Sequence, residues 1–242
     1  MRDYRHFLFF AEKATPEKVT LDQLETRHAV NVLRLTEKSR FLATDGRGTT
    51  YKCIHSGIIN RELEGIVEEK WYSEQISPRI HLFTGIPERD PFESILVDCT
   101  ALGTTSISPL ICDFSQNKWW ENAWEKQLAR FQNKMIASMK QSLSPWLPRL
   151  CNPVHFSDAI KNLTGTVLVA DPIGQSIFVN REKVIEKNEI TILVGPPGGF
   201  SPSEEEQLKK PHFVHVKIAG TRLRTELAST VLCSQALGIL ME

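Results

Sequence analysis

The sequence lacks the features that would place the protein in a membrane or in an oxidising compartment. No apolar run is long enough to span a bilayer, and the N-terminal residues carry no apolar signal core. The five cysteines are widely spaced and form no C-x-x-C pair, so we expect neither a disulfide framework nor a zinc site. We therefore expect a cytoplasmic protein.

Strong net charge and the common nucleotide motifs are also missing. The formal charge is zero, with 29 basic and 29 acidic residues, which excludes a generally basic polyanion binder but leaves room for a local basic patch. There is no G-x-G-x-x-G, no G-x-x-x-x-G-K and no G-x-S-x-G, so dinucleotide, P-loop and hydrolase interpretations have no support. A chain of 242 residues can form one large domain or two small ones.

Two glycine-bearing turns are the most informative feature that is present. The β-prone run 190–194 leads into Gly-Pro-Pro-Gly-Gly-Phe-Ser at 195–201, and the run 213–218 leads into Ala-Gly-Thr-Arg-Leu-Arg-Thr-Glu at 219–226. A strand that ends in such a turn leaves main-chain N–H groups free at the carboxyl edge of a sheet, where α/β proteins bind ligands. Two such turns, one short helix apart, predict a single site built from both.

Each turn is followed by a predicted helix. Ser201 is the expected N-cap of the first, with Pro202 at its first position and Glu204 completing a capping box. Gly198 and Gly199 are expected to adopt backbone angles closed to other residues, or to let a ligand approach the main chain. Thr225 is a candidate cap for a closing helix over 226–240. That helix carries the apolar residues Leu227, Val231, Leu232, Leu237 and Leu240.

Beyond about residue 78, strands and helices alternate. The near-continuous apolar runs 79–84, 166–170, 190–194 and 213–218 are typical of parallel strands covered on both faces. Between the first two, apolar residues at spacings of three and four predict one long amphipathic helix that ends near Pro145. These residues are Trp120, Trp124, Leu128, Phe131, Met135 and Met139. This alternation predicts an α/β sheet.

The first 74 residues differ, because they are β-rich with one helix. Residues 24–35 carry Leu24, Ala29, Val32 and Leu33, a pattern that favours a short amphipathic helix. The Asp-Gly step at 45–46 between two β-prone runs indicates a hairpin, and 63–67 is another strand. Several short strands around one helix suggest a small barrel.

Two side-chain groups admit a functional and a structural interpretation. His212 and His215 have the spacing of a metal pair, but no third ligand lies nearby, so we expect no metal. The tryptophans Trp119, Trp120 and Trp124 are more typical of core or dimer packing than of a base-stacking platform.

Five ordered blocks resemble one protein family. They are 28–35 (HAVNVLRL), 102–110 (with L-G and I-S-P-L), 139–148 (with M-K-Q-S-L), 195–201 and 223–228 (LRTELA). They are similar to H-x-x-x-V-L-R-L, L-G-V-x-x-I-x-P-L, a Q-S helix end, G-P-E-G-G-F-S and L-R-T-E-T-A. These are motifs of the RsmE-type 16S ribosomal RNA (uracil-N3) methyltransferases, within the SPOUT superfamily. The resemblance covers nearly the whole chain.

The resemblance implies two domains and a cofactor. Residues 1–74 would form a PUA-like RNA-binding β-barrel, and residues 75–242 a dimerising SPOUT domain with an α/β trefoil knot. The cofactor would be S-adenosylmethionine, held by the backbone of both turns, with apolar side chains around its adenine. The expected cofactor-binding residues are Leu168, Leu193, Gly195, Pro196, Gly198, Gly199, Ile218, Gly220, Leu223 and Thr225.

The implied reaction transfers a methyl group to N3 of a uridine in 16S ribosomal RNA, free or in the small ribosomal subunit. Arg224 is our candidate for stabilising the negative charge that develops as N3 loses its proton. Glu226 is expected to position Arg224 or to help carry the proton; alternatively, it is an acid favoured by the helix dipole. Basic residues on both domains are candidates for phosphate contacts, or else solvated surface charges. They are Arg27, Arg34, Arg40, Arg47, Lys134 and Lys140.

Four positions depart from the family pattern. Pro197 stands where the family has Glu, Asp98 and Ala101 replace the Lys and Glu of a K-A-T-E-L-G block, and Ser144 replaces a basic residue. Three of the four changes remove or reverse a charge near the expected substrate side, and the change at Pro197 alters the cofactor turn. The alternative to an active enzyme is therefore a diverged homologue that binds RNA or the cofactor with altered substrate or little methyl transfer.

Overall fold

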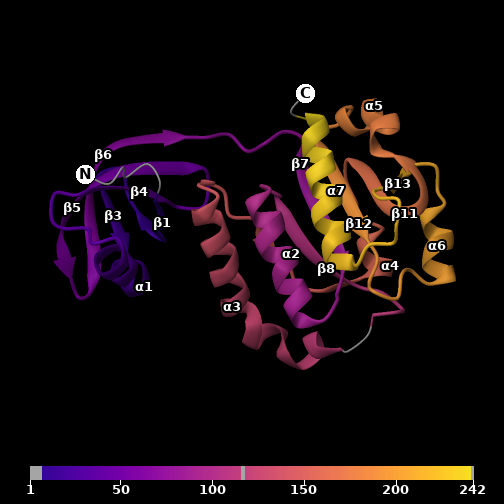
Figure 1. Cartoon of the computed structure of the whole chain (residues 1–242), viewed down its shortest axis with the longest axis horizontal. Helices are drawn as coiled ribbons and strands as arrows, with labels where there is room; N and C mark the ends of the chain where they lie inside the picture. Colours follow the sequence, from indigo (N-terminus) through magenta and orange to yellow (C-terminus); the bar gives the residue numbers. More distant parts are fainter. Residues whose placement is uncertain (1–6, 116–117, 241–242) are drawn as a thin grey trace. The chain divides into compact units, whose positions relative to one another are not determined.

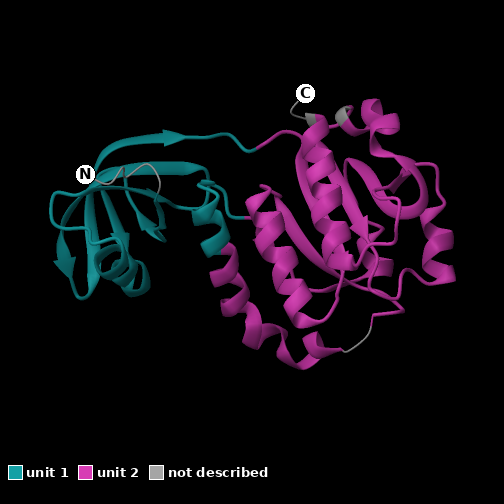
Figure 2. Cartoon of the chain, viewed as in Figure 1, with its two compact units in different colours: residues 1–75, 136–147 teal, residues 76–135, 148–242 magenta. Residues whose placement is uncertain are grey.

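The computed structural model describes residues 7–115 and 118–240, without the side chains of Ile185 and Leu240 (Figure 1). The chain forms two compact units, one of residues 1–75 with 136–147 and the other of residues 76–135 with 148–242 (Figure 2). All five cysteines are free. No helix in the described part of the chain is long and apolar enough to cross a membrane.

The first unit is a curled six-stranded sheet with the strand order β1-β4-β5-β6-β3-β2. Its strands are β1 (Leu8–Phe10), β2 (Lys13–Ala14), β3 (Lys18–Leu21), β4 (Arg40–Thr44), β5 (Thr49–Ile59) and β6 (Glu62–Tyr72). Among the strands described in this unit, only β1 and β4 pair in parallel. The inward faces share one apolar core that includes Phe9, Phe41 and Leu63. The predicted small β-rich domain with one helical segment is thus confirmed.

The Asp-Gly hairpin forms where it was predicted, between β4 and β5. The Asp45 carboxylate accepts hydrogen bonds from the backbone N–H groups of Arg47 (2.8 Å) and Thr49 (3.2 Å). Gly46 and Gly48 have φ values of 72° and 96°, which favour glycine. The turn is therefore specified by local chemistry, which explains why the sequence alone predicted it.

The predicted helix over 24–35 exists, but only Ala29 and Leu33 of its predicted apolar face pack against the core. Helix α1 (Gln23–Arg27) continues as a π-helical turn, η2 (His28–Val32), which breaks the 3.6-residue period. Leu24 and Val32 are consequently 65% and 61% exposed, whereas Ala29 is fully buried. Glu25 is buried instead, where it accepts a hydrogen bond from the Phe10 N–H (3.3 Å).

The stretch 136–147 contributes Trp146 to the same unit. Its indole Nε1 donates to the Ser73 carbonyl (2.9 Å), and its ring meets Tyr72 edge to face, with centroids 5.8 Å apart. The Gly48 N–H donates to the Pro145 carbonyl (2.9 Å). A Cβ atom at Gly48 would lie 2.4 Å from Trp146 Cζ2, so the hairpin and this stretch meet only because residue 48 has no side chain.

The second unit is built on seven parallel strands in the order β10-β8-β7-β12-β11-β13, with β9 beside β8. They are β7 (Arg79–Gly85), β8 (Ser106–Ile111), β9 (Arg149–Leu150), β10 (Val154–His155), β11 (Thr166–Ser176), β12 (Glu189–Val194) and β13 (Phe213–Lys217). The four strands predicted from apolar runs are confirmed. Strand β8 gave a weaker signal, because Ser106, Ser108 and Pro109 interrupt its apolar pattern although the strand is buried.

Helices accompany this sheet. They are α2 (Arg89–Ala101), α3 (Trp119–Gln141), α4 (Phe156–Ala159), the 3₁₀ turn η3 (Ile177–Asn180), α5 (Arg181–Ile185), α6 (Pro202–Leu208) and α7 (Thr225–Leu240). Helix α7 packs against α2, β7 and β12 (Figure 1). The hydroxyls of Thr84 on β7 and Ser229 on α7 lie 3.0 Å apart. Strand order does not report threading of the chain, so the trefoil knot stays a prediction.

Helix α3 is the predicted long amphipathic helix, and its aromatic residues are core residues. Trp120 and Trp124 are buried, and the Trp124 ring packs 5.8 Å from Phe92 on α2 and 5.5 Å from Phe131. The prediction that the tryptophan cluster serves packing is confirmed for these two residues.

A substitution at Gly48 tests the Trp146 contact. We expect Gly48→Ala to lower the free energy of unfolding by more than about 2 kcal/mol, because it adds a clash to the strain of positive φ. Gly57→Ala is the matched control, since Gly57 also has positive φ (153°) but a Cβ there would meet no atom within 4 Å. Urea denaturation followed by circular dichroism would measure both. Equal losses in the two variants would show that the contact with Trp146 contributes nothing.

Candidate functional site

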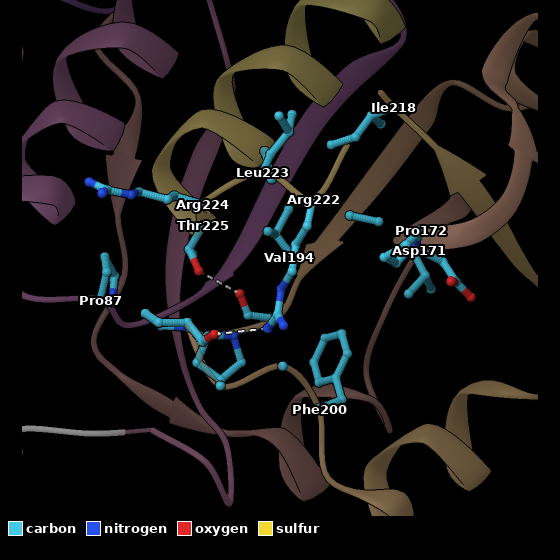
Figure 3. Close-up of a pocket in the computed structure, with 18 of the residues that line it drawn as sticks. Pro87, Asp171, Pro172, Val194, Phe200, Ile218, Arg222, Leu223, Arg224 and Thr225 are labelled. Atoms are coloured by element: carbon cyan, nitrogen blue, oxygen red, sulfur yellow. Dashed lines mark hydrogen bonds between the residues drawn. The ribbon is translucent and has the colours of Figure 1, made fainter. Parts of the chain in front are cut away.

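Four neighbouring strands contribute to one cavity in the second unit. β7, β12, β11 and β13 lie side by side in this order, and a cavity of about 1080 Å³ is lined by residues that follow β7, β12 and β13 and by residues 169–173 within β11 (Figure 3). The lining comes from four segments of the chain, 86–91, 169–173, 194–200 and 218–228, with further residues from α6 and β13. A cavity of this size at this edge of a parallel sheet is typical of a small-molecule site.

Two hydrogen bonds join the glycine-bearing turns. The Thr225 hydroxyl donates to the Gly195 carbonyl (3.0 Å), and Arg222 Nη2 donates to the Pro197 carbonyl (3.2 Å). Both bonds are drawn in Figure 3. Each runs from the turn after β13 to the turn after β12, so the structure brings the two turns into one site, as the sequence predicted. Thr225 is the first residue of α7.

The turn after β12 is shaped by both of its prolines and glycines. The Gly199 N–H donates to the Pro196 carbonyl (2.8 Å), which closes a four-residue turn with Pro197 at its second position. Proline is favoured there because its ring presets φ. Gly199 has a φ of 80°, whereas Gly198 does not have positive φ. A Cβ at Gly198 would instead lie 2.9 Å from Phe114 Cβ, so Gly198 is needed for close packing on the neighbouring loop.

The predicted capping box is present and anchors the same turn. Ser201 Oγ accepts from the Glu204 N–H (3.3 Å), and Glu204 Oε2 accepts from the Ser201 N–H (2.7 Å). Both side chains also bond to Asp113. The Ser201 hydroxyl donates to the Asp113 carboxylate (2.6 Å), and the Asp113 backbone N–H donates to Glu204 Oε1 (3.0 Å). The loop after β8 therefore supports the turn that lines the cavity.

Seven of the ten expected cofactor-binding residues line the cavity, and three do not. Leu168 and Leu193 are fully buried in the strands, and their successors Val169 and Val194 line the cavity instead. Alternation along a strand explains this shift by one residue. Gly220 is outside the lining, between Ala219 and Thr221, which belong to it. The seven that line the cavity are Gly195, Pro196, Gly198, Gly199, Ile218, Leu223 and Thr225.

Both expected catalytic residues lie at this cavity. Arg224 is exposed, and its side chain makes no hydrogen bond or ion pair with the described residues. This side chain extends on the side of Pro87, away from the Arg222–Pro197 bond (Figure 3). Glu226 is half-buried in the first turn of α7 and also lines the cavity. Arg224 is therefore a free cation at the rim, available to a ligand.

The loop after β7 also lines the cavity, a role that sequence reasoning missed. Ile86, Pro87, Glu88 and Pro91 belong to the lining, and Trp119 Nε1 on α3 donates to the Pro87 carbonyl (3.0 Å). Gly85 allows the approach, since a Cβ there would lie 2.2 Å from the Pro196 nitrogen. The Gly-Ile-Pro step at the end of an apolar strand is the same kind of signal as the two turns that were recognised.

His215 was considered only as a metal ligand, and the structure gives its ring two other partners. Nδ1 lies 2.8 Å from Asp171 Oδ2, and Nε2 lies 2.9 Å from the Leu208 carbonyl oxygen. All three residues line the cavity. Within the described residues, no cluster of three or more histidine, cysteine or acidic side chains has the arrangement of a metal site.

The six candidate RNA-binding residues fall into two groups. Three of them form ion pairs. Arg40 Nε lies 2.7 Å from Glu68 Oε2, Lys134 Nζ lies 2.9 Å from Glu93 Oε2, and the partly buried Lys140 pairs with Glu25. Burial acts to raise the pKa of Glu93, but hydrogen bonds from Arg130 and Lys134 outweigh it and hold that pKa below its usual range. Each of these three cations therefore has an ionic partner within the protein, although Lys134 shares Glu93 with Arg130. The exposed residues Arg27, Arg34 and Arg47 have no ionic partner among the described residues.

Comparisons with known proteins agree with this geometry. Residues 74–237 match a family model for an RNA methyltransferase domain, and residues 21–68 match one for an RNA methyltransferase PUA domain. The chain is 25% identical to the ribosomal RNA small subunit methyltransferase E of Aquifex aeolicus, over 94% of this chain and 97% of that protein. It is 22% identical to the protein of the same name from Bacillus subtilis, over 93% and 92%.

Solved structures show the same fold. The ribosomal RNA small subunit methyltransferase E of Neisseria gonorrhoeae, bound to S-adenosyl methionine, superposes with a TM-score of 0.84 at 23% identity, over 96% of this chain and 97% of that one. A probable rRNA methyltransferase from Porphyromonas gingivalis gives 0.82 at 23% identity, over 97% and 98%. Because the methyltransferase model alone matches well over half of the sequence, the chain belongs to the RNA methyltransferase family.

Proposed function

We propose that this protein methylates N3 of a uridine in 16S ribosomal RNA, with S-adenosylmethionine as the methyl donor. The observation that carries the proposal is the one cavity that both turns line, with Arg224, which has no ionic partner among the described residues, at its rim. The names of the relatives from Aquifex aeolicus and Bacillus subtilis support ribosomal RNA as the substrate class. We assign RNA binding to residues 1–74 and methyl transfer to residues 75–242.

The residues present fit the cofactor. Val169, Val194, Ile218 and Leu223 supply apolar walls for an adenine ring. A Cβ at Gly199 would meet no atom within 4 Å, so a ligand can approach the main chain there. The backbone groups at Gly195 to Gly199 and at Ile218 to Leu223 are thus proposed as the binding groups, except that Gly220 lies outside the lining. S-adenosylmethionine supplies the methyl group when it is bound.

The side chains of the rim act on the uracil. N3 becomes nucleophilic only when its proton leaves, and the negative charge then spreads onto the neighbouring carbonyl oxygens. Arg224 stabilises this charge through charge-assisted hydrogen bonds, and it has no carboxylate partner among the described residues that would reduce this effect. Glu226, two residues further on, positions Arg224 or accepts the proton. Arg27, Arg34 and Arg47 are proposed to contact phosphates.

The departures from the family pattern have local roles. Pro197 occupies the turn position that favours proline, and Asp98 Oδ2 accepts from the Thr230 hydroxyl (3.3 Å), which links α2 to α7. The Ser144 hydroxyl donates to the Trp146 carbonyl (3.2 Å). Ala101 is exposed, and the structure gives no reason for its replacement of a charged residue. Because these roles leave the cavity open, we favour the enzyme over a diverged binder.

The cofactor prediction concerns Thr225. Thr225→Val keeps the shape of the side chain but removes the hydroxyl bonded to Gly195, so we expect about a tenfold loss of S-adenosylmethionine affinity in calorimetry. Thr225→Ser keeps the hydroxyl and is the matched control, with affinity within about threefold of wild type. Equal affinity of the valine and wild-type proteins would exclude the bond between the turns as a determinant of the site.

The catalytic prediction concerns Arg224. Its contribution belongs to the transition state, so Arg224→Ala should lower the single-turnover rate on small ribosomal subunits by roughly two to three orders of magnitude. Cofactor affinity should change little. Arg224→Lys should recover part of the rate, because an ammonium keeps the charge but lacks the planar fork. A wild-type rate in the alanine variant would make Arg224 structural. A wild-type protein that binds cofactor and RNA without methylating would favour the diverged binder.

We also propose that the protein works in the cytoplasm as a homodimer. Of the apolar residues expected on α7, Leu232 and Leu237 belong to the core of the second unit, whereas Leu227 is 49% exposed. Leu240 lies outside the described side chains. The dimer proposal therefore rests on the family resemblance and on exposed residues such as Leu227.

Light scattering tests this assembly. We expect a mass near twice 27.5 kDa at micromolar concentration, and a shift toward the monomer in Leu227→Asp, because a charge would oppose burial of that site. Ile173→Asp is the control, since Ile173 is 92% exposed on another element. A wild-type mass of 27.5 kDa would contradict the dimer.

A further inference from the structure

The His215 ring lies between two oxygen acceptors. A backbone carbonyl only accepts hydrogen bonds, so the 2.9 Å contact between Nε2 and the Leu208 oxygen requires a proton on Nε2. A carboxylate also only accepts, so the 2.8 Å contact between Nδ1 and Asp171 Oδ2 requires a second proton. A neutral imidazole carries one N–H. The pair His215–Asp171 therefore holds one proton more than a neutral ring and a free carboxylate would hold.

Through these two hydrogen bonds the protonated His215 ring connects three segments that line the cavity. Asp171 comes from β11, His215 from β13, and Leu208 is the last residue of α6. The two side chains are only 32% and 22% exposed, so water competes weakly for their contact. In Figure 3 the Asp171 carboxylate points away from Arg222.

We propose that His215 is a positioning residue of the cofactor cavity, and that cofactor affinity falls when the proton shared with Asp171 leaves. The proposal rests on the proposed function in naming the cofactor. When the proton passes to solvent, the ring keeps one N–H and can satisfy only one of its two acceptors. Either Asp171 or Leu208 then loses its bond to the ring, so the Asp171 carboxylate or the end of α6 loses its contact with His215, while the backbone pairing of β11 with β13 stays in place.

Other charged groups lie on the elements around His215. Glu205 on α6 and Lys209, which directly follows α6, line the same cavity, and Arg222 follows β13. A hydrogen bond from Lys209 to Glu206 raises the pKa of Lys209, so that lysine stays charged throughout the relevant pH range. Arg222 is bonded to Pro197, and Lys217 is exposed on the same strand as His215. Among the described residues, only Asp171 and Leu208 bond to the His215 ring.

Deprotonation of the His215–Asp171 pair would change ligand affinity in two ways, and the two can be distinguished because they act in opposite directions on S-adenosylmethionine. By charge alone, a pair that goes from neutral to negative would favour the cationic S-adenosylmethionine and leave its neutral product, S-adenosylhomocysteine, unaffected. Loss of the wall contact weakens both ligands. The proposal therefore predicts that both affinities fall as the pH rises.

Nuclear magnetic resonance of the free protein tests the proton directly. In ¹H–¹⁵N spectra of the imidazoles recorded over a pH series, we expect both His215 nitrogens to show the signature of protonated nitrogen at the acidic end and only one of them at the alkaline end. A single protonated nitrogen across this whole range would overturn the proposal. This measurement needs no cofactor, so its result is independent of the proposed function.

Calorimetry over the same pH range tests the coupling. For wild type we expect both ligands to bind about tenfold more weakly at the high end, the effect of one charged hydrogen bond. Asp171→Asn should keep the low-pH affinity and give a flat profile, because an amide N–H can donate to the neutral Nδ1. His215→Gln should be weak and flat. His212→Gln, which removes an exposed histidine three residues away, should keep the wild-type profile.

Three results would overturn the coupling: a flat wild-type profile, a retained slope in Asp171→Asn, or stronger S-adenosylmethionine binding at high pH. Absence of binding at every pH would contradict the proposed function, and the spectra would still decide whether His215 holds the proton.

Discussion

The site depends on two hydrogen bonds to backbone carbonyls, from Thr225 to Gly195 and from Arg222 to Pro197. The parallel sheet places the ends of β12 and β13 at one edge but not next to each other, because β11 lies between them. The two bonds span this gap and turn separate strand ends into one cavity. The same bonds fix the positions of the rim residues Arg224 and Glu226, because the turn after β13 leads directly into α7.

Local chemistry explains what was predictable from the sequence. The hairpin at Asp45 and Gly46 and the capping box of Ser201 and Glu204 use bonds between residues at most four apart, so a short window of sequence contains all the information. Apolar runs predicted the four strands that carry the cavity. The two glycine-bearing turns, read with the family resemblance, located the cavity and its rim.

Long-range contacts explain what was not predictable. Gly198 was expected to adopt backbone angles closed to other residues or to let a ligand approach the main chain. It is needed instead because Phe114, more than eighty positions away in the chain, packs against it. Lys140 was predicted to bind RNA, but in the folded protein it forms an ion pair with Glu25, a residue far away in the sequence. Leu168 and Leu193 missed the cavity by one residue each, because an apolar run buried on both faces does not reveal which face a given residue occupies.

A cavity made largely of main chain and apolar walls tolerates changes that a cavity of charged side chains would not. Pro197 can replace an acidic residue because the contribution of this position is a turn geometry and a carbonyl that accepts from Arg222. Asp98 acts outside the lining, where it links α2 to α7. The methyl-transfer step does not tolerate such changes, because a negative charge that develops in the transition state is stabilised only by a cation placed beside it. In this chain we propose Arg224 for that role, because it lines the cavity and no described residue neutralises it.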